Sequence, residues 1–246
     1  MASVTARYHR SVAQILSQIC SSEAHNLEAA AELAAKALAA DEIIFIVGSG
    51  HSHMIAEEGF YRAGGIAALQ AILEPRLMLH DGAIASTAAE RELGLAATVI
   101  AKYPVTSGSV VVVVSNSGRN AYPIEMALEA KARGAKVIAI TSRAMARSVP
   151  SRHPSGKLLA DFADVVIDNH VPVGDAVLEL PRSGKQMGPT STIAGAFIIN
   201  AMLAEAVERA KEAGCSLDVY SSANGINQGE SAENIATRWE GRIIGL

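Results

Sequence analysis

Unbroken runs of apolar residues recur along the chain and predict strands that are buried on both faces. The clearest run is Val110–Val114, which is made only of valine. Apolar, β-branched residues without alternation are typical of a parallel sheet that is covered by helices on both sides. Further strands are predicted over residues 42–47, 65–73, 136–141 and 164–168.

Helical spacing of apolar residues predicts helices between these strands. Residues 4–40 are rich in Ala, Leu and Glu, with Val12, Ile15, Leu16 and Ile19 on one face. Within this stretch, Ser21-Ser22-Glu23 can start a second helix. Further helices are predicted over residues 52–63, 90–102 and 121–133. A longer helix begins within residues 188–192 and runs to about residue 213, and a short amphipathic segment covers 235–244. Residues 169–187 are expected to be irregular.

Strands therefore alternate with helices at least four times, which predicts an α/β fold with a doubly wound, mostly parallel sheet. Crossovers in such sheets are right-handed, and ligands bind at the carboxyl ends of the strands. We divide the chain into N-terminal helices (1–40), a central domain (41–214) and a C-terminal tail (215–246) with an Asn224-Gly225 turn. The small residues of 29–40 can pack against a second subunit or cover the sheet edge.

The valine run ends in Ser115, Asn116, Ser117 and Gly118, and Asn120 can cap the helix that follows. Backbone N–H groups, the positive end of a helix dipole and two hydroxyls meet there, a combination that suits a phosphate dianion. Because capping uses the same residue types, a turn that binds no ligand is the alternative. Arg119 is either a phosphate contact or a surface residue.

Similar polar residues occur at two other places, after the first strand and at the start of the last long helix. After the first strand comes a Gly-x-Gly turn with the residues Gly48, Ser49, Gly50, His51, Ser52 and His53. The glycines lack the third member of a dinucleotide fingerprint, so we interpret this turn as a sugar-phosphate site rather than a nicotinamide site. Before the last long helix, Gly188-Pro189 leads into a hydroxyl-bearing helix start with the residues Thr190, Ser191 and Thr192.

Composition narrows the classes of function. The chain has 246 residues, 50% of them hydrophobic, and a net charge of -4, which disfavours a broad nucleic-acid surface. We expect no membrane span, because residues 192–207 are too short an apolar run and contain Asn200 and Glu205. Residues 1–20 lack the apolar core of a signal peptide, and two cysteines do not form a disulfide framework, so we expect a cytoplasmic protein.

The three turns in this order resemble the sugar isomerase (SIS) phosphosugar-binding family, over roughly residues 25–212. The fold of this family is flavodoxin-like and has three layers, with the sheet between two layers of helices. The first turn, followed by Ala56, Glu57 and Glu58, is most similar to the phosphoheptose isomerase branch. The start of the last long helix is similar to the aldose–ketose isomerase and N-acetylmuramic acid 6-phosphate etherase branches, and it departs from the phosphoheptose isomerases, which puts heptose as the substrate in doubt.

The resemblance implies a phosphate held by Ser115, Asn116 and Ser117, with Ser52 on the sugar. It also implies a catalytic base on the helix after the first turn, best matched by Glu58 and next by Glu57. His51 and His53 can help proton transfer, and Glu74 or His80 can join from the connecting wall. The spacing of His51, His53 and Glu57 also allows a metal, but we predict neither a metal nor a cofactor.

We expect an aldose–ketose isomerase that acts on a sugar phosphate. The alternatives are a lyase or etherase and a non-catalytic phosphosugar sensor. Residues 1–40 do not supply a convincing DNA-binding helix-turn-helix, which favours an enzyme over a sensor. The family resemblance further implies a homodimer or homotetramer.

Overall fold

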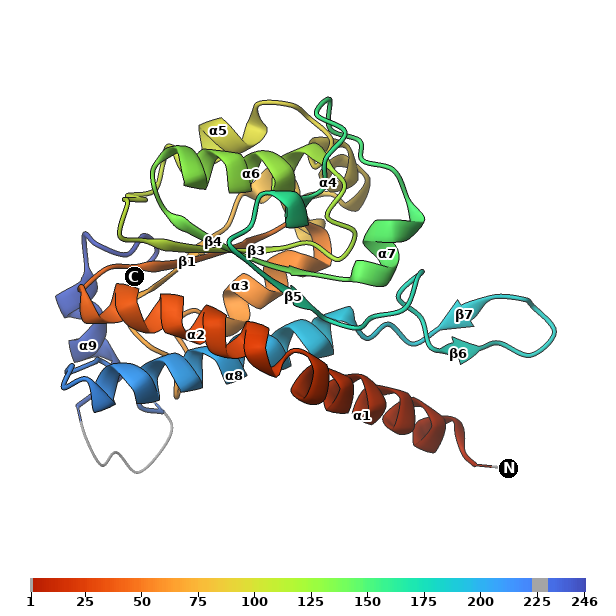
Figure 1. Ribbon diagram of the computed structural model, residues 1–246, viewed down its shortest axis with the longest axis horizontal. Coiled ribbons are helices and arrows are strands. Elements are labelled where there is room, and N and C mark those ends of the chain that lie inside the picture. The colour runs from red at the N-terminus through yellow and green to blue at the C-terminus, as the bar shows by residue number, and fades with distance from the viewer. Residues whose placement is uncertain (1, 223–229) are drawn as a thin grey trace.

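The computed structural model describes residues 2–222 and 230–246, and a parallel sheet forms its centre (Figure 1). The strands are β1 (Ile44–Gly48), β2 (Leu69–Ile72), β3 (Val110–Val114), β4 (Lys136–Thr141) and β5 (Val165–Asp168). Their spatial order is β2-β1-β3-β4-β5, and each neighbouring pair is parallel. This is the strand order of flavodoxin-like doubly wound sheets, which confirms the predicted fold class.

Helices cover both faces of the sheet (Figure 1). On one face lie α4, α5 and α6, and on the other lie α2, α3 and α8. The helices are α1 (Val4–Ser22), α2 (Ala24–Ala39), α3 (His53–Gly59), α4 (Ala83–Ala89), α5 (Leu95–Ile100), α6 (Ala121–Ala132), α7 (Arg143–Ser148), α8 (Ser191–Glu212) and α9 (Ala232–Trp239). Short 3₁₀ turns are η1 (Gly50–Ser52), η2 (Pro75–Leu77), η3 (Leu79–Asp81) and η4 (Leu159–Asp161).

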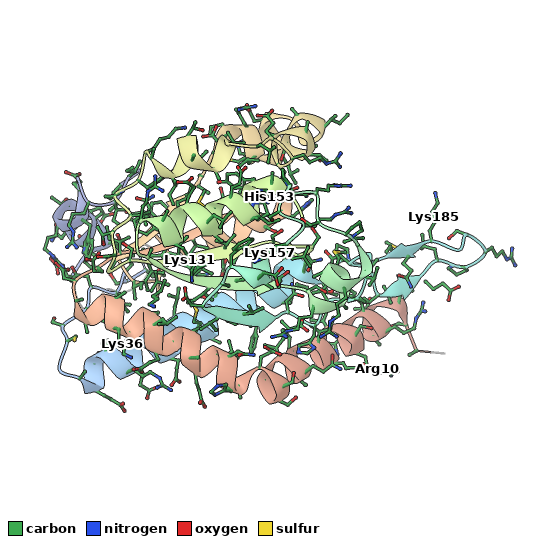
Figure 2. All side chains as sticks on the ribbon, turned by 45° about the horizontal axis from the view of Figure 1, so that its top comes forward. Arg10, Lys36, Lys131, His153, Lys157 and Lys185 are labelled. Carbon is green, nitrogen blue, oxygen red and sulfur yellow. The ribbon has the colours of Figure 1, made fainter. Side chains whose placement is uncertain are left out.

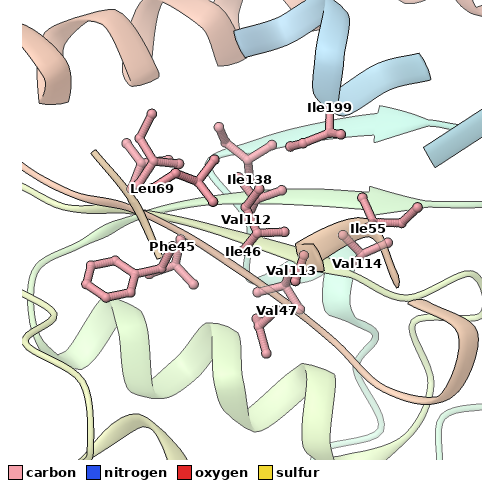
Figure 3. Packing of buried hydrophobic residues seen from close by; sticks show 14 of the residues in the cluster. Phe45, Ile46, Val47, Ile55, Leu69, Val112, Val113, Val114, Ile138 and Ile199 are labelled. Carbon is pink, nitrogen blue, oxygen red and sulfur yellow. The ribbon is translucent and has the colours of Figure 1, made fainter. Parts of the chain in front are cut away.

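The central strands are buried on both faces, as the valine run predicted. Phe45, Val112 and Ile138 have no exposed surface, and they pack between the two helix layers (Figure 3). Ile55 from α3 and Ile199 from α8 close the core on one side of the sheet. All three predicted parts of the chain contribute buried side chains to this core, from Ile15 to Ile243.

Helix α8 is the one helix of the described residues that is long and apolar enough to cross a membrane. It runs along α2 and α3, and its residues Ile198, Ile199 and Met202 have no exposed surface. Gly195 allows the close approach to α3, because a Cβ there would lie 2.9 Å from the side chain of Ile55. Its apolar composition therefore serves the core of this domain.

Helix α1 and a small hairpin project from the same end of the molecule (Figure 1). The hairpin consists of β6 (Leu178–Glu179) and β7 (Gln186–Met187), which pair antiparallel. Arg10 on α1 and Lys185 in the hairpin lie on this projecting end (Figure 2). Tyr8 of α1 donates a hydrogen bond of 2.6 Å to the carbonyl of Pro189, which ties the base of the hairpin to α1.

Several predicted boundaries are wrong. The helix after the first turn ends at Gly59 rather than at residue 63, because Phe60 is extended with φ -89° and ψ 134°. The helix expected over 90–102 begins only at Leu95, since Gly94 before it has φ 82°. Residues 169–187 contain the hairpin, and the C-terminal helix starts earlier than predicted, where the Ser231 hydroxyl accepts from Asn234 N–H. The expected turn at Asn224-Gly225 lies outside the described residues.

Candidate functional site

The two polar turns that follow β1 and β3 lie next to each other. Gly48 pairs with Val114 in the register of these strands, so both turns leave the same edge of the sheet. The chain passes from β1 outward to β2 and then crosses back to β3 on the other side of β1, which makes the carboxyl ends of β1 and β3 the topological switch point of the sheet. In open α/β sheets, ligands bind in the crevice at this point.

The turn after β3 is held in shape by its own residues. The buried Ser115 hydroxyl accepts a hydrogen bond from the Gly118 N–H at 3.2 Å. Gly118 has φ 59°, which favours glycine, and its carbonyl accepts from the Leu159 N–H at 2.8 Å. Ser115 therefore supports the turn, whereas the half-buried Ser117 hydroxyl has no hydrogen-bond partner among the described residues.

A small pocket lies between this turn, the first turn and the start of α8. Of the predicted site residues it brings together His51, Ser52, Asn116, Ser191 and Thr192. The other predicted residues do not line it: Ser49, Gly50, His53, Glu57, Glu58, Ser115, Ser117, Gly118, Asn120 and Thr190. Further lining comes from Ile55, Val114, Ile140, Asn169 and Gly195.

Asn120 and Thr190 stand at the helix starts where the sequence places them, but neither side chain caps its helix. The Asn120 side chain accepts a hydrogen bond of 3.1 Å from Arg152, at the start of α6. At the start of α8, the Asp175 carboxylate accepts from the N–H groups of Thr190 and Ser191, both at 2.9 Å, and from the Ser191 hydroxyl. The positive end of α8 is therefore partly satisfied by a carboxylate of the same chain.

In the first turn, the two histidines differ in their surroundings. His51 is exposed and lines the pocket, while His53 is buried. The His53 ring contacts the Gly50 carbonyl through Nδ1 and faces Glu57 Oε2 through Nε2 at 3.5 Å. His80 packs against it edge to face, with ring centroids 6.3 Å apart. His80 therefore packs on the first turn through His53, but it does not line the pocket.

The two candidate catalytic carboxylates point in different directions. Glu57 is half exposed and reaches back to His53. Glu58 lies on the α8 side of α3, where its Oε1 accepts from Asn200 at 2.8 Å and from Arg62. Glu74 is nearly buried and pairs with Lys102 at 2.8 Å, so it serves as a structural ion pair on the wall.

Three arginines gather beside the turn after β3. Arg152 N–H donates to the Arg119 carbonyl at 2.8 Å, and desolvation together with the charges of Arg119 and Arg91 lowers the pKa of Arg152. Arg119 is half buried, and its Nε has no hydrogen-bond partner in the described part of the chain. The Glu90 carboxylate also acts on Arg152, but the three arginines together leave an excess of positive charge here, which favours an anion.

A larger cavity of about 510 Å³ lies at the opposite, amino ends of the strands. Arg238 and Arg242 line it, but Arg238 pairs with Asp218 and Glu230, and Arg242 pairs with Asp41. These cations are already neutralised within the chain. The smaller pocket at the carboxyl edge, with its hydroxyls and amides, is the better candidate for a ligand site.

Two polar residues of this site were not predicted. Asn169 lines the pocket and donates to Asn116 Oδ1 at 2.9 Å, and Asp175 caps α8. Asn169 directly follows β5 at the carboxyl edge, so its position along the chain was an available signal. Asp175 lies 15 residues before the helix that it caps, a separation that no local pattern in the sequence reveals.

A family model described as the SIS domain matches residues 7–142. Among full-length relatives, a UPF0309 protein of Listeria innocua is 41% identical and covers 94% of this chain and 93% of the relative. A UPF0309 protein of Brucella ovis is 42% identical over 98% of both chains.

Two solved structures share the fold. A phosphoheptose isomerase from Neisseria gonorrhoeae has a TM-score of 0.56 and 21% identity, covering 83% of this chain and 97% of that chain. Another from Francisella tularensis has a TM-score of 0.51 and 17% identity, covering 85% and 100%. The resemblance noted from the three turns is confirmed at the level of the family and the fold.

Proposed function

Because the chain belongs to the SIS domain family, we propose that the pocket between the turns after β1 and β3 and the start of α8 binds a sugar phosphate. The observation that carries this proposal is the set of hydroxyls that line the pocket or lie on the turn beside it. Those of Ser52, Ser117 and Thr192 have no hydrogen-bond partner among the described residues, so they can donate to a ligand.

In this proposal the phosphate sits at the turn after β3 and the start of α6. Ser117, the backbone of the turn and the nearby Arg119 supply donors and positive charge there. The sugar lies toward Ser52, Asn169 and Thr192, which line the pocket on its other sides.

Calorimetric titration with fructose 6-phosphate, glucose 6-phosphate and N-acetylglucosamine 6-phosphate tests the binding proposal. Each is compared with its unphosphorylated sugar at the same concentration. We expect binding of at least one phosphate ester and none of its parent sugar. Equal binding of both forms, or of neither for all three pairs, contradicts a phosphosugar site.

Replacing Ser117 by Ala is expected to weaken the binding of the sugar phosphate by about 1–3 kcal/mol, or roughly 5- to 150-fold in Kd. The reason is the loss of a hydrogen bond to a charged group. Ser115→Ala should have an effect of similar size, because the turn loses the acceptor for Gly118 N–H. Calorimetry measures both, with Ser183→Ala in the exposed hairpin loop as the control. Unchanged affinity in both turn variants would discard this assignment.

For the reaction, we propose an aldose–ketose isomerisation by proton transfer. It requires a base next to the carbonyl and donors for the enediolate. Glu58, with Glu57 as the alternate, is the proposed base, and His51 and His53 are the proposed helpers. A hydroxyl-bearing start of α8 in the pocket also suits a lyase or etherase.

Turnover of the same phosphate esters, followed by product analysis, separates these reactions. An interconverted aldose and ketose supports the isomerase. Release of lactate from N-acetylmuramic acid 6-phosphate, added to this panel because it carries an ether substituent, supports the lyase or etherase. Binding without any turnover supports a sensor. We place the reaction in the cytoplasm, with no nucleic-acid partner.

We further expect self-association through the projecting end of the molecule. The small residues of α2 are not available for this, since Ala30, Ala31 and Ala34 are buried within the chain. Exposed apolar side chains instead lie on α1 and β7, where Val4 is 58% and Met187 is 51% exposed. Burying such residues between subunits is favourable.

Light scattering coupled to gel filtration should therefore show a dimer or tetramer at micromolar concentration. The double variant Val4→Glu, Met187→Glu should shift it toward the monomer. Ile84→Glu on α4 is the control, because Ile84 is 89% exposed on another part of the surface. A monomeric wild-type protein under these conditions contradicts the prediction.

A further inference from the structure

A second cluster of chemically reactive side chains lies behind the pocket, where the α1–α2 junction meets the end of β5. It consists of Glu23, Asp168 and His170, and each offers one ligand atom within 4.8 Å of the others. Both carboxylates are buried, and the ring is partly buried. The three residues come from two segments that are far apart in the sequence.

In each carboxylate, N–H donors hold one oxygen and leave the other free to face the histidine. Glu23 Oε2 accepts from Asn26 and from Asp168 N–H, and Asp168 Oδ1 accepts from the N–H groups of Arg143 and His170. The remaining oxygens face the imidazole, with Glu23 Oε1 3.4 Å from Nε2 and Asp168 Oδ2 4.0 Å from Nδ1. In metal sites, ligating carboxylates are commonly oriented in this way, by hydrogen bonds to the oxygen that does not face the ion.

The charges in this cluster do not balance. Two buried carboxylates share one imidazole, and no Lys or Arg lies within ion-pair distance of either in the described residues. Buried charges in proteins are normally paired or coordinate a metal. The cluster therefore carries a net negative charge that a divalent cation would neutralise.

The spacing and the donor types fit a first-row divalent ion. Ligand atoms each about 2.1 Å from a zinc ion in tetrahedral geometry are about 3.4 Å apart, and Glu23 Oε1 and His170 Nε2 have this separation. Asp168 Oδ2 faces the other ring nitrogen, Nδ1, at 4.0 Å, so its carboxylate has to turn toward the Nε2 side to reach the same ion. Imidazole together with carboxylate suits Zn²⁺, or Mn²⁺, better than Ca²⁺ or Mg²⁺. The Ser22 hydroxyl donates to the Gln18 carbonyl at 2.7 Å and lies 2.8 Å from His170 Nε2, so it is placed to accept the Nε2–H, a proton that an ion bound at Nε2 would displace.

The geometry points to a divalent metal site formed by Glu23, Asp168 and His170, which takes Zn²⁺ or Mn²⁺ and fastens the α1–α2 junction to the edge strand β5. Asn169 stands between two of the ligands and lines the sugar pocket. The ion would therefore also fix the backbone that carries Asn169. This site is separate from the proposed catalytic residues, and it departs from the expectation that the protein binds no metal.

Titration of the metal-free, untagged full-length chain with ZnCl₂ and with MnCl₂ in a calorimeter tests this inference. We expect one ion per chain at this site, with affinity reduced at least about tenfold in Glu23→Gln and in His170→Gln. The matched control is His153→Gln, because His153 faces the single carboxylate of Glu125 at 3.8 Å. It should leave the affinity unchanged. Asp168 is not substituted, since its carboxylate also accepts from the first residue of α7.

Absence of stoichiometric binding to the wild-type chain, or equal affinity in both ligand variants, would overturn the site. Circular dichroism shows whether each variant is folded. If neither ligand variant folds, Co²⁺ added to the wild-type chain decides the question. Ligand-field absorption that His153→Gln retains supports the site, and its absence in the wild type overturns it. No sugar enters these measurements, so their outcome is independent of the proposed function.

Discussion

Replacing Glu58 by Gln is expected to lower kcat by about 10²–10⁴-fold, the usual contribution of one positioned base. Glutamine keeps the shape of the side chain and its bond with Asn200, but it cannot take a proton. Glu58 comes three residues after Ile55 on the side of α3 that faces α8, and Ile55 lines the pocket. Substrate affinity should change little, because the phosphate is held at a different turn. Steady-state kinetics on the sugar phosphate that is turned over measures both quantities.

Glu57→Gln is the matched comparison, since Glu57 is the adjacent carboxylate and turns toward His53 instead. We expect it to retain most of the wild-type kcat. A large loss in Glu57→Gln alone would move the role of base to the Glu57–His53 pair. If both variants turn over substrate at nearly the wild-type rate, the base lies elsewhere. A thermal unfolding scan of each variant separates lost chemistry from lost stability, because Glu58 also pairs with Arg62.

Replacing Phe45 by Ala is expected to lower the free energy of unfolding by about 3–5 kcal/mol. Phe45 is the largest side chain of β1, has no exposed surface and packs between β1 and the helix layer of α6 (Figure 3). Its truncation leaves a cavity that the neighbouring valines cannot fill without moving the sheet. Since a domain is typically stable by only about 5–15 kcal/mol, this variant should unfold at a markedly lower denaturant concentration.

Urea unfolding followed by circular dichroism measures this loss. Ile84→Ala is the control, because Ile84 is 89% exposed on α4 and its truncation should change stability by no more than about 0.5 kcal/mol. Similar midpoints for Phe45→Ala and Ile84→Ala would show that the core does not depend on Phe45 as described.

The strands of the central sheet could be predicted from the sequence because burial on both faces leaves a clear pattern, whereas the short helices α4 and α7 were not predicted. The valine run of β3 and the apolar segments of β1, β4 and β5 each lie within a residue or two of their predicted positions. Helix ends were less accurate, because they depend on single backbone conformations. Gly94 at φ 82° and the extended Phe60 set boundaries that apolar spacing does not encode.

Part of the candidate site could be predicted from the sequence in the same way. Turns at the carboxyl ends of β1 and β3 were expected to be polar, and the parallel sheet places them side by side. The direction in which each side chain points could not be predicted. Glu57 and Glu58 are adjacent in the sequence, yet one meets His53 and the other meets Asn200 of α8, a contact across 142 positions. Asp175 and Asn169 likewise acquire their roles only through tertiary contacts.

The carboxylate that caps α8 has a consequence for how a bound molecule is oriented. Two helix starts, those of α6 and α8, face the site, and each would attract an anion on its own. Asp175 already occupies the start of α8 with a negative charge, so a phosphate there would meet repulsion. At the start of α6 the Tyr122 N–H donates to the Glu90 carbonyl at 3.0 Å, but no carboxylate among the described residues caps this helix, and arginines stand beside it. The site therefore has a polarity of its own: we expect a ligand with one charged and one neutral end to enter in a single direction, its phosphate toward α6 and its hydroxyls toward α8.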